Sequence, residues 1–188
     1  MNVAKFGLNY MKIGKPFKSA SLGKITQGYS EQHKALDLSC KYGEWLVAPF
    51  NCKIERIKIA MIFEKETMSE LEQGYGLLMK STEDPTITCS YWHTMPFFPV
   101  REEMIVLRGE PIAQGGNSGF VLSNGQYVPL KDRTKFPHSG THLHWSMPED
   151  WTNKIEWDKE IKFDLLMAVY LTFLSITNFF KKNDNRTN

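Results

Sequence analysis

The middle of the chain consists of short strand-like runs separated by turn residues. The clearest is the run 52–59, in which apolar and polar side chains alternate with a period of two. Comparable runs occupy residues 25–29, 45–49, 75–80, 86–93, 104–107 and 111–114. Many short strands with Gly- and Pro-containing turns, and no alternating helices, predict a mainly β fold built on an antiparallel sheet.

The two ends of the chain have a different character. Residues 1–24 are basic and contain several Gly and Ser residues, so we expect an extended lead-in with little structure of its own. Residues 165–180 form an uncharged apolar run, which is shorter than the ~20 residues that comfortably span a bilayer. Small or polar residues recur there at helical spacing and predict a C-terminal helix packed on the sheet or on a partner. Membrane contact through residues 165–180 is the alternative that we do not favour.

Composition excludes several classes of protein. A chain of 188 residues, 41% hydrophobic and 13% aromatic, suits one domain with a sizeable core. The net charge of +2, from 23 basic and 21 acidic residues, gives no indication of nucleic-acid binding. The three cysteines, Cys40, Cys52 and Cys89, lack Cys-x-x-Cys spacing and argue against a disulfide framework or a zinc ribbon. The first residues lack the continuous apolar core of a signal peptide.

Two strand-like runs far apart in the sequence carry the candidate chemistry. In the run Gly-Thr-His-Leu-His-Trp-Ser, the alternation of strand side chains puts His142 and His144 on the same face. In the run His-Lys-Ala-Leu-Asp-Leu-Ser, an extended backbone puts His33 and Asp37 on the same face. Side by side in one sheet, the two runs would form a cluster of imidazoles and a carboxylate. This is the ligand set of a catalytic zinc site.

These runs belong to a longer series of motifs that resembles a known family. In chain order the motifs are His33-x-x-x-Asp37, Gly43-x-x-Leu46-Val47-Ala48-Pro49, Tyr91-x-His93, Gly116-Asn117-Ser118-Gly119 and His142-Leu143-His144. Over residues 25–147 the series resembles the lysostaphin/LytM-type peptidoglycan endopeptidases, peptidase family M23. The resemblance implies an open antiparallel β sandwich of LytM type. It also implies a lead-in (1–24), a metallopeptidase domain (25–150), and a C-terminal linker, apolar helix and basic tail (151–188).

The resemblance assigns roles to particular residues. His33, Asp37 and His144 match the three zinc ligands of the family, which leaves a fourth position for water. His93 and His142 match its two non-ligand active-site histidines. Such histidines would act as general base and acid or would stabilise an oxyanion, and the sequence does not divide these roles between them.

Three further residues are candidates for contact with substrate. Asn117 falls in a turn that lies near the metal-binding residues in this family. We therefore expect it to contact either one of these residues or the substrate. Tyr29 and Tyr91 are candidates for lining the cleft, and we expect neither to be catalytic.

One stretch departs from the pattern of the family. Residues 120–139 separate the Gly-Asn-Ser-Gly turn from the His-Leu-His motif, whereas relatives connect the two within a few residues. An insertion there would reshape substrate choice, with Lys131, Arg133 and Lys135 facing an anionic wall polymer. The alternative is an inert loop.

Two functions are compatible with these residues. The leading hypothesis is a zinc-dependent endopeptidase that hydrolyses peptide bonds of peptidoglycan, in stem peptides or cross-bridges. Such an enzyme would act at the bacterial cell wall, in an extracellular, periplasmic or virion-associated setting, and the compact domain suits a bacteriophage lysin. The alternative is a non-enzymatic LytM-like domain that binds wall peptides or activates a separate amidase. Because relatives of the second kind lack some metal-binding or catalytic residues, the complete set here favours the enzyme.

Overall fold

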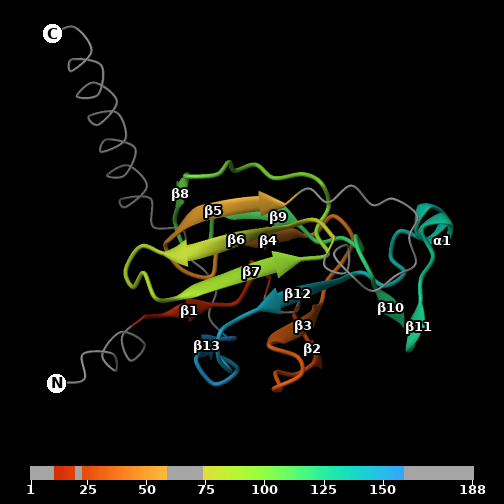
Figure 1. Ribbon diagram of the computed structural model, residues 1–188, viewed down its shortest axis with the longest axis horizontal. Coiled ribbons are helices and arrows are strands. Elements are labelled where there is room, and N and C mark those ends of the chain that lie inside the picture. Colours follow the sequence, from red (N-terminus) through yellow and green to blue (C-terminus); the bar gives the residue numbers. More distant parts are fainter. Residues whose placement is uncertain (1–10, 20–22, 59–73, 159–188) are drawn as a thin grey trace, which may run out of the picture.

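The computed structural model describes residues 11–19, 23–58 and 74–158, which form mostly β structure (Figure 1). Seven antiparallel strands make the main sheet. From one edge to the other they are β2 (Ile25–Gln27), β3 (Ala35–Ser39), β12 (His142–Ser146), β7 (Thr88–Trp92), β6 (Gly76–Ser81), β5 (Cys52–Lys58) and β8 (Ile105–Val106). The predicted mainly β fold with an antiparallel sheet is confirmed.

A small second sheet closes the core over one face of the main sheet. It pairs β4 (Trp45–Val47) with β9 (Pro111–Gln114) in antiparallel fashion. Leu46 and Ile112 from this sheet belong to the same buried cluster as Leu77 and Leu143 from the main sheet. Burial of these side chains is the main stabilising contribution to the fold. Only the opposite face of the main sheet is left for polar side chains.

Strand alternation sorts the side chains of β12 onto these two faces. Leu143 and Trp145 are completely buried, whereas His142 and His144 are partly exposed. The two histidines therefore share a face, as predicted. The strand predicted from His33 starts later than expected, because β3 begins at Ala35 and His33 lies in the preceding turn.

Segments on both sides of the predicted 25–150 domain also join the core. β1 (Ile13–Gly14) pairs in parallel with β13 (Ile155–Glu156). Ile13, Phe17 and Trp151 are completely buried. The expectation that the lead-in has little structure is therefore wrong for residues 11–17, because its apolar side chains fill the core. The boundaries of the three predicted segments stay a prediction.

The insertion folds into a hairpin and a short helix at one end of the main sheet (Figure 1). The hairpin pairs β10 (Leu122–Ser123) with β11 (Gln126–Tyr127). The helix α1 (Leu130–Lys135) follows Pro129, its N-cap residue, which has an extended backbone and makes no capping hydrogen bond with its side chain. Strands and helices this short contain too few residues for a periodic pattern of apolar side chains. The sequence therefore did not predict them.

The predicted C-terminal helix and the apolar run 165–180 lie outside the described residues. Within the described residues, no helix is both long enough and apolar enough to cross a membrane.

Tyr91, predicted to line the cleft, belongs to the core instead. It is completely buried, and its hydroxyl donates to the carbonyl oxygen of Val47 at 2.9 Å. Across the β7–β12 pair it stands in register with Trp145, and the two rings make an edge contact. Directly opposed residues share a face of the sheet, so Tyr91 points away from the histidines. The substrate contact predicted for it is wrong.

Replacing Tyr91 by phenylalanine is expected to lower the free energy of unfolding by about 1–3 kcal/mol, because the buried carbonyl of Val47 loses its donor. Urea unfolding followed by tryptophan fluorescence measures this change. Tyr42→Phe is the matched control, since Tyr42 is only half-buried, and it is expected to change stability by less than about 0.5 kcal/mol. Equal stability of Tyr91→Phe and the wild type would show that the hydroxyl bond contributes nothing.

Candidate active site

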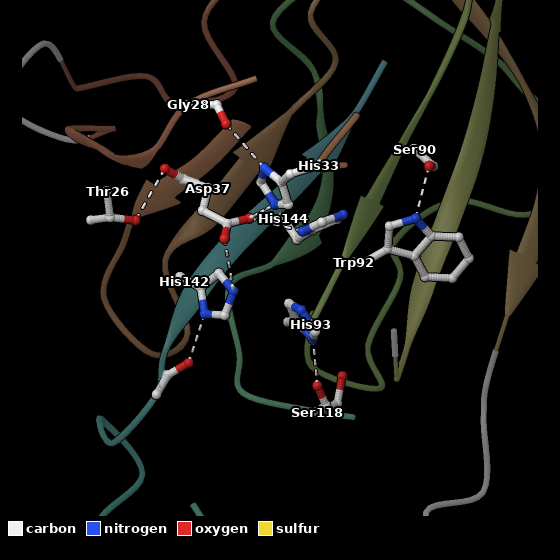
Figure 2. Close-up of polar contacts among 11 residues, drawn as sticks. Thr26, Gly28, His33, Asp37, Ser90, Trp92, His93, Ser118, His142 and His144 are labelled. Atoms are coloured by element: carbon white, nitrogen blue, oxygen red, sulfur yellow. Dashed lines mark hydrogen bonds and ion pairs between the residues drawn. The ribbon is translucent and has the colours of Figure 1, made fainter. Parts of the chain in front are cut away.

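The face of the main sheet that points away from the core carries imidazoles around one carboxylate (Figure 2). His144 lies directly opposite Asp37 in the β12–β3 pairing, and its Nδ1 is 2.8 Å from Oδ1 of Asp37. His33 reaches the same oxygen from the turn before β3, with its Nε2 at 3.4 Å. The three side chains offer donor atoms that all lie within 4.8 Å of one another.

The donor set fits a zinc ion. Two imidazole nitrogens and a carboxylate oxygen are typical ligands of catalytic zinc, and ligand atoms on a tetrahedral ion lie roughly 3.3–3.6 Å apart. The 3.4 Å between His33 and Asp37 falls in this range, whereas the 2.8 Å between His144 and Asp37 is the shorter distance of a hydrogen bond. Nδ1 of His33 donates to the carbonyl of Gly28 at 3.1 Å, which leaves Nε2 unprotonated toward Asp37. His33, Asp37 and His144 thus form a group that could hold a metal ion.

Two further histidines border this group. Nε2 of His142 lies 4.0 Å from Oδ2 of Asp37. His93 comes directly after β7, and its ring centre lies 4.6 Å from that of His142 and 5.6 Å from that of His144. The structure therefore brings both predicted non-ligand histidines to the edge of the candidate metal group.

Both of these histidines are anchored through Nδ1 on a backbone carbonyl. His93 donates to Ser118 at 2.7 Å (Figure 2). His142 donates to Gly140 at 2.9 Å. Because a carbonyl oxygen only accepts hydrogen bonds, this partner assigns the ring proton to Nδ1. Nε2 of each ring is then unprotonated and free to accept a proton.

Burial controls the charge of these groups. Burial, helped by the nearby His142 and His144, lowers the pKa of His93 to about 3, and burial also lowers the pKa of His142. Burial opposes the ionisation of Asp37, but its hydrogen bond with His144 and the surrounding imidazoles hold its pKa below the ordinary value. At neutral pH the site therefore presents one carboxylate and two neutral imidazoles that can act as bases.

The backbone of His93 is held in an unusual conformation by its neighbours. Its φ is 60°, in the left-handed region that residues other than Gly and Asn seldom adopt. A Cβ atom on Gly116 would lie 2.7 Å from the backbone nitrogen of Met95 and from the carbonyl carbon of Thr94. Glycine at position 116 thus lets the turn 116–119 approach the chain next to His93, where Ser118 meets the ring.

Gly116→Ala is expected to destabilise the protein by roughly 1–3 kcal/mol, because the added methyl group meets backbone atoms that cannot yield. Chemical denaturation measures the loss. Gly28→Ala serves as the control, since a Cβ there meets nothing within 4 Å. An unchanged unfolding midpoint for Gly116→Ala would mean that the close approach of the turn is not required.

The histidines lie in a cleft of about 1220 Å³. This volume exceeds the roughly 300–1,000 Å³ of pockets for small molecules and leaves room for a segment of polymer. Phe120, Leu122 and Asn124 of the insertion line one part of the cleft, and Gln27 and Lys34 line another. The insertion is therefore a wall of the cleft.

Asn117 is engaged with the insertion. It is only 9% exposed, and its side-chain amide donates to the carbonyl oxygens of Pro137 (2.9 Å) and Ser139 (3.1 Å). Among the described residues, Asn117 is not part of the cleft lining. The insertion thus occupies the amide nitrogen of Asn117, which argues against the predicted substrate contact.

Two other predictions near the cleft have different outcomes. Tyr29 donates its hydroxyl to the carbonyl of Pro148, a cleft-lining residue, at 3.3 Å, and its role toward substrate stays a prediction. Arg133 is only 5% exposed, so the expectation that it faces a wall polymer is wrong. Lys131 and Lys135 are exposed, but neither lines the cleft.

Sequence reasoning missed the groups that orient the histidines. These are the carbonyl oxygens of Gly28, Ser118 and Gly140. Every residue carries a carbonyl group, so no residue type marks such a position. Only the glycines in these loops hinted that the backbone comes close to other groups there.

Comparisons with solved structures add to this picture, although the sequence matches no protein-family model and no curated protein. The structure is similar to a zinc-containing peptidase from Vibrio cholerae, with a TM-score of 0.50, 15% identity, and coverage of 73% of this chain and 37% of that one. It is similar to the antimicrobial peptidase lysostaphin from Staphylococcus simulans, with a TM-score of 0.52, 13% identity, and coverage of 82% and 57%. Helicobacter pylori Csd3 gives a TM-score of 0.52, 14% identity, and coverage of 95% and 42%.

At these identities the likeness shows the fold of the chain. Less than two thirds of each of the three similar chains is covered. The likeness by itself shows no activity, substrate or partner of this chain.

Proposed function

We propose that this chain, which has the M23-type peptidase fold, is a zinc-dependent peptidase that hydrolyses peptide bonds in bacterial peptidoglycan. The observation that carries the proposal is the convergence of five side chains in one cleft. They are His33, Asp37 and His144 as a metal-binding group, with His93 and His142 beside it. The names of two similar structures, a zinc-containing peptidase and lysostaphin, agree with this chemistry.

The metal would be held by Nε2 of His33, the carboxylate of Asp37 and Nδ1 of His144. Zinc bound there supplies Lewis acidity, which makes water a stronger acid and polarises an amide carbonyl. The Gly28 carbonyl fixes the tautomer of His33 before any metal arrives. The protein thus presents a prearranged donor set.

His93 and His142 supply the proton transfers. With Nδ1–H held by a carbonyl, either ring can accept at Nε2 the one proton that the water releases as it attacks the carbonyl carbon. That ring then carries Nε2–H, which can hydrogen-bond to the oxyanion and passes its proton to the leaving amine nitrogen as the C–N bond breaks. Burial keeps both rings neutral at neutral pH, so Nε2 is open to a proton, but a pKa of about 3 makes His93 a weak base.

The charges in the cleft suit a peptide that bears carboxylates, as stem peptides of peptidoglycan do. Among the described residues that line the cleft, Asp37 is the only carboxylate and Lys34 is the only lysine or arginine. A metal ion on Asp37 would leave the cleft positively charged overall. An anionic peptide therefore enters without meeting a second carboxylate. The place of action is then the cell wall, reached from outside the cell, from the periplasm or from a virion such as that of a phage.

The test is to incubate the purified protein with sacculi of different cross-bridge chemistry and to identify released fragments by mass spectrometry. Release of fragments with a new amino terminus in the stem peptide or in the cross-bridge is expected. Stoichiometric zinc without cleavage of any sacculus would contradict the proposal. That result would favour the alternative, a LytM-like domain that binds wall peptides or activates an amidase.

A further inference from the structure

The insertion is joined to the turn 116–119 by a buried guanidinium group. Nη1 of Arg133 donates to the carbonyl oxygens of Asn117 at 2.7 Å and Gly119 at 2.6 Å. Nε of the same side chain donates to the carbonyl of Val128 at 2.7 Å. The planar fork of arginine reaches these carbonyls from two different nitrogens, whereas the donors of an ammonium group all sit on one nitrogen.

The two carbonyls held by Arg133 flank the carbonyl that orients His93. Ser118 lies between Asn117 and Gly119, and its own carbonyl accepts Nδ1–H of His93 at 2.7 Å. The hydroxyl of Ser118 also accepts the backbone N–H of Tyr75 at 2.9 Å. Residues 117 and 118 belong to no strand, so these side-chain bonds hold the turn in place of a sheet ladder.

The contact between turn and insertion is reciprocal. Arg133 of the insertion holds the turn, and the Asn117 side chain of the turn holds the carbonyls of Pro137 and Ser139 in the insertion. Displacement of either part therefore displaces the other. The ring of His93 depends on this unit, because the Ser118 carbonyl is the hydrogen-bond partner that fixes its proton on Nδ1.

We propose that Arg133 is a positioning residue, which fixes the orientation and the tautomer of His93 through the carbonyls of the turn 116–119. The insertion then positions a catalytic histidine in addition to lining the cleft. The consequence for catalysis rests on the proposed function of His93. The consequence for the tautomer of His93 does not depend on hydrolysis.

Two substitutions of Arg133 test this role. Arg133→Met keeps much of the side-chain length and removes all donors, whereas Arg133→Lys keeps the charge but not the fork. Lys135→Met is the matched control, because Lys135 lies on the same helix and is exposed. Long-range proton–nitrogen NMR spectra of the full-length chain report which ring nitrogen of His93 carries the proton.

In the wild type and in Lys135→Met, His93 is expected to be protonated on Nδ1 alone. In Arg133→Met its two ring nitrogens are expected to exchange the proton, and Arg133→Lys is expected to give an intermediate spectrum. On sacculi, kcat of Arg133→Met is expected to fall about 10- to 100-fold with KM within about twofold, as for a misplaced catalytic group. Zinc content should remain unchanged.

An unaltered His93 tautomer in folded Arg133→Met and Arg133→Lys would overturn the proposal. Failure of both variants to fold would also overturn it, since Arg133 would then serve stability alone. If the wild type cleaves no sacculus but the tautomer shifts as expected, the positioning role stands and the proposed function fails.

Discussion

Asp37→Ala and His144→Ala are each expected to lose zinc and, with it, all hydrolysis of peptidoglycan. Both residues belong to the metal group, and Oδ1 of Asp37 lies within 3.4 Å of one histidine nitrogen and 2.8 Å of the other. Loss of a residue that only supports a metal ligand costs about 10- to 100-fold in affinity, so loss of a ligand should weaken zinc binding by more than about 100-fold. Metal analysis after dialysis against a weak chelator measures the loss.

The matched control for the metal ligands is His138→Ala. His138 is an exposed histidine that lines the same cleft but lies outside the metal group, with its ring at the edge of Tyr42. Its zinc content and rate should equal those of the wild type. If His144→Ala held zinc as tightly as the wild type, the ligand assignment would be wrong.

His93→Ala and His142→Ala are expected to separate metal binding from catalysis. Neither ring belongs to the metal group, so each variant should bind one zinc ion as the wild type does. Removing a positioned acid or base should lower kcat by about 10²- to 10⁴-fold, because proton transfer then falls to solvent. Initial rates of fragment release at saturating sacculus concentration measure the effect.

The double variant tests whether the two histidines work as a unit. Their ring centres are 4.6 Å apart, and both face the candidate metal group. If they share one proton-transfer path, the double variant should be little slower than the slower single variant. A full rate in either single variant, with zinc retained, would remove that histidine from the mechanism.

The sequence predicted the parts of the fold that depend on a regular period. The alternation in residues 140–146 put His142 and His144 on one face and Leu143 on the other, and the burial of these residues agrees. The same rule would have placed Tyr91 in the core, had its opposition to Trp145 been known. The register between two strands far apart in the chain cannot be derived from the sequence of either strand. The wrong prediction for Tyr91 could therefore not be avoided.

The insertion was located from the sequence, but its secondary structure could not be predicted. Its strands are two residues long and its helix six, so local composition decides nothing there. Arg133 was predicted to be exposed, because arginine is seldom buried without a partner. Its partners are the backbone carbonyls of residues 117, 119 and 128. Because every residue has a carbonyl, the residue types at these positions do not reveal such partners.

The metal group could be predicted in part. The resemblance to a family supplied the set His33, Asp37 and His144, and the structure gathers these residues within reach of one ion. Strand alternation alone supplied a cluster of imidazoles and a carboxylate typical of zinc sites, without choosing the ligands among the histidines. The pairing of His144 with Asp37 in register and the anchoring of His33 on Gly28 came from the folded backbone.

Zinc-dependent cleavage of a peptide bond is most directly measured by stripping one preparation of metal, reloading it with zinc, and digesting sacculi in ¹⁸O-labelled water. The account predicts no fragments from the metal-free protein and restored release after reloading. Each cut should then yield one new amino group and one new carboxyl group that carries a single ¹⁸O atom. Undiminished cleavage by the metal-free protein, or release of fragments without a new amino and carboxyl pair, would contradict it.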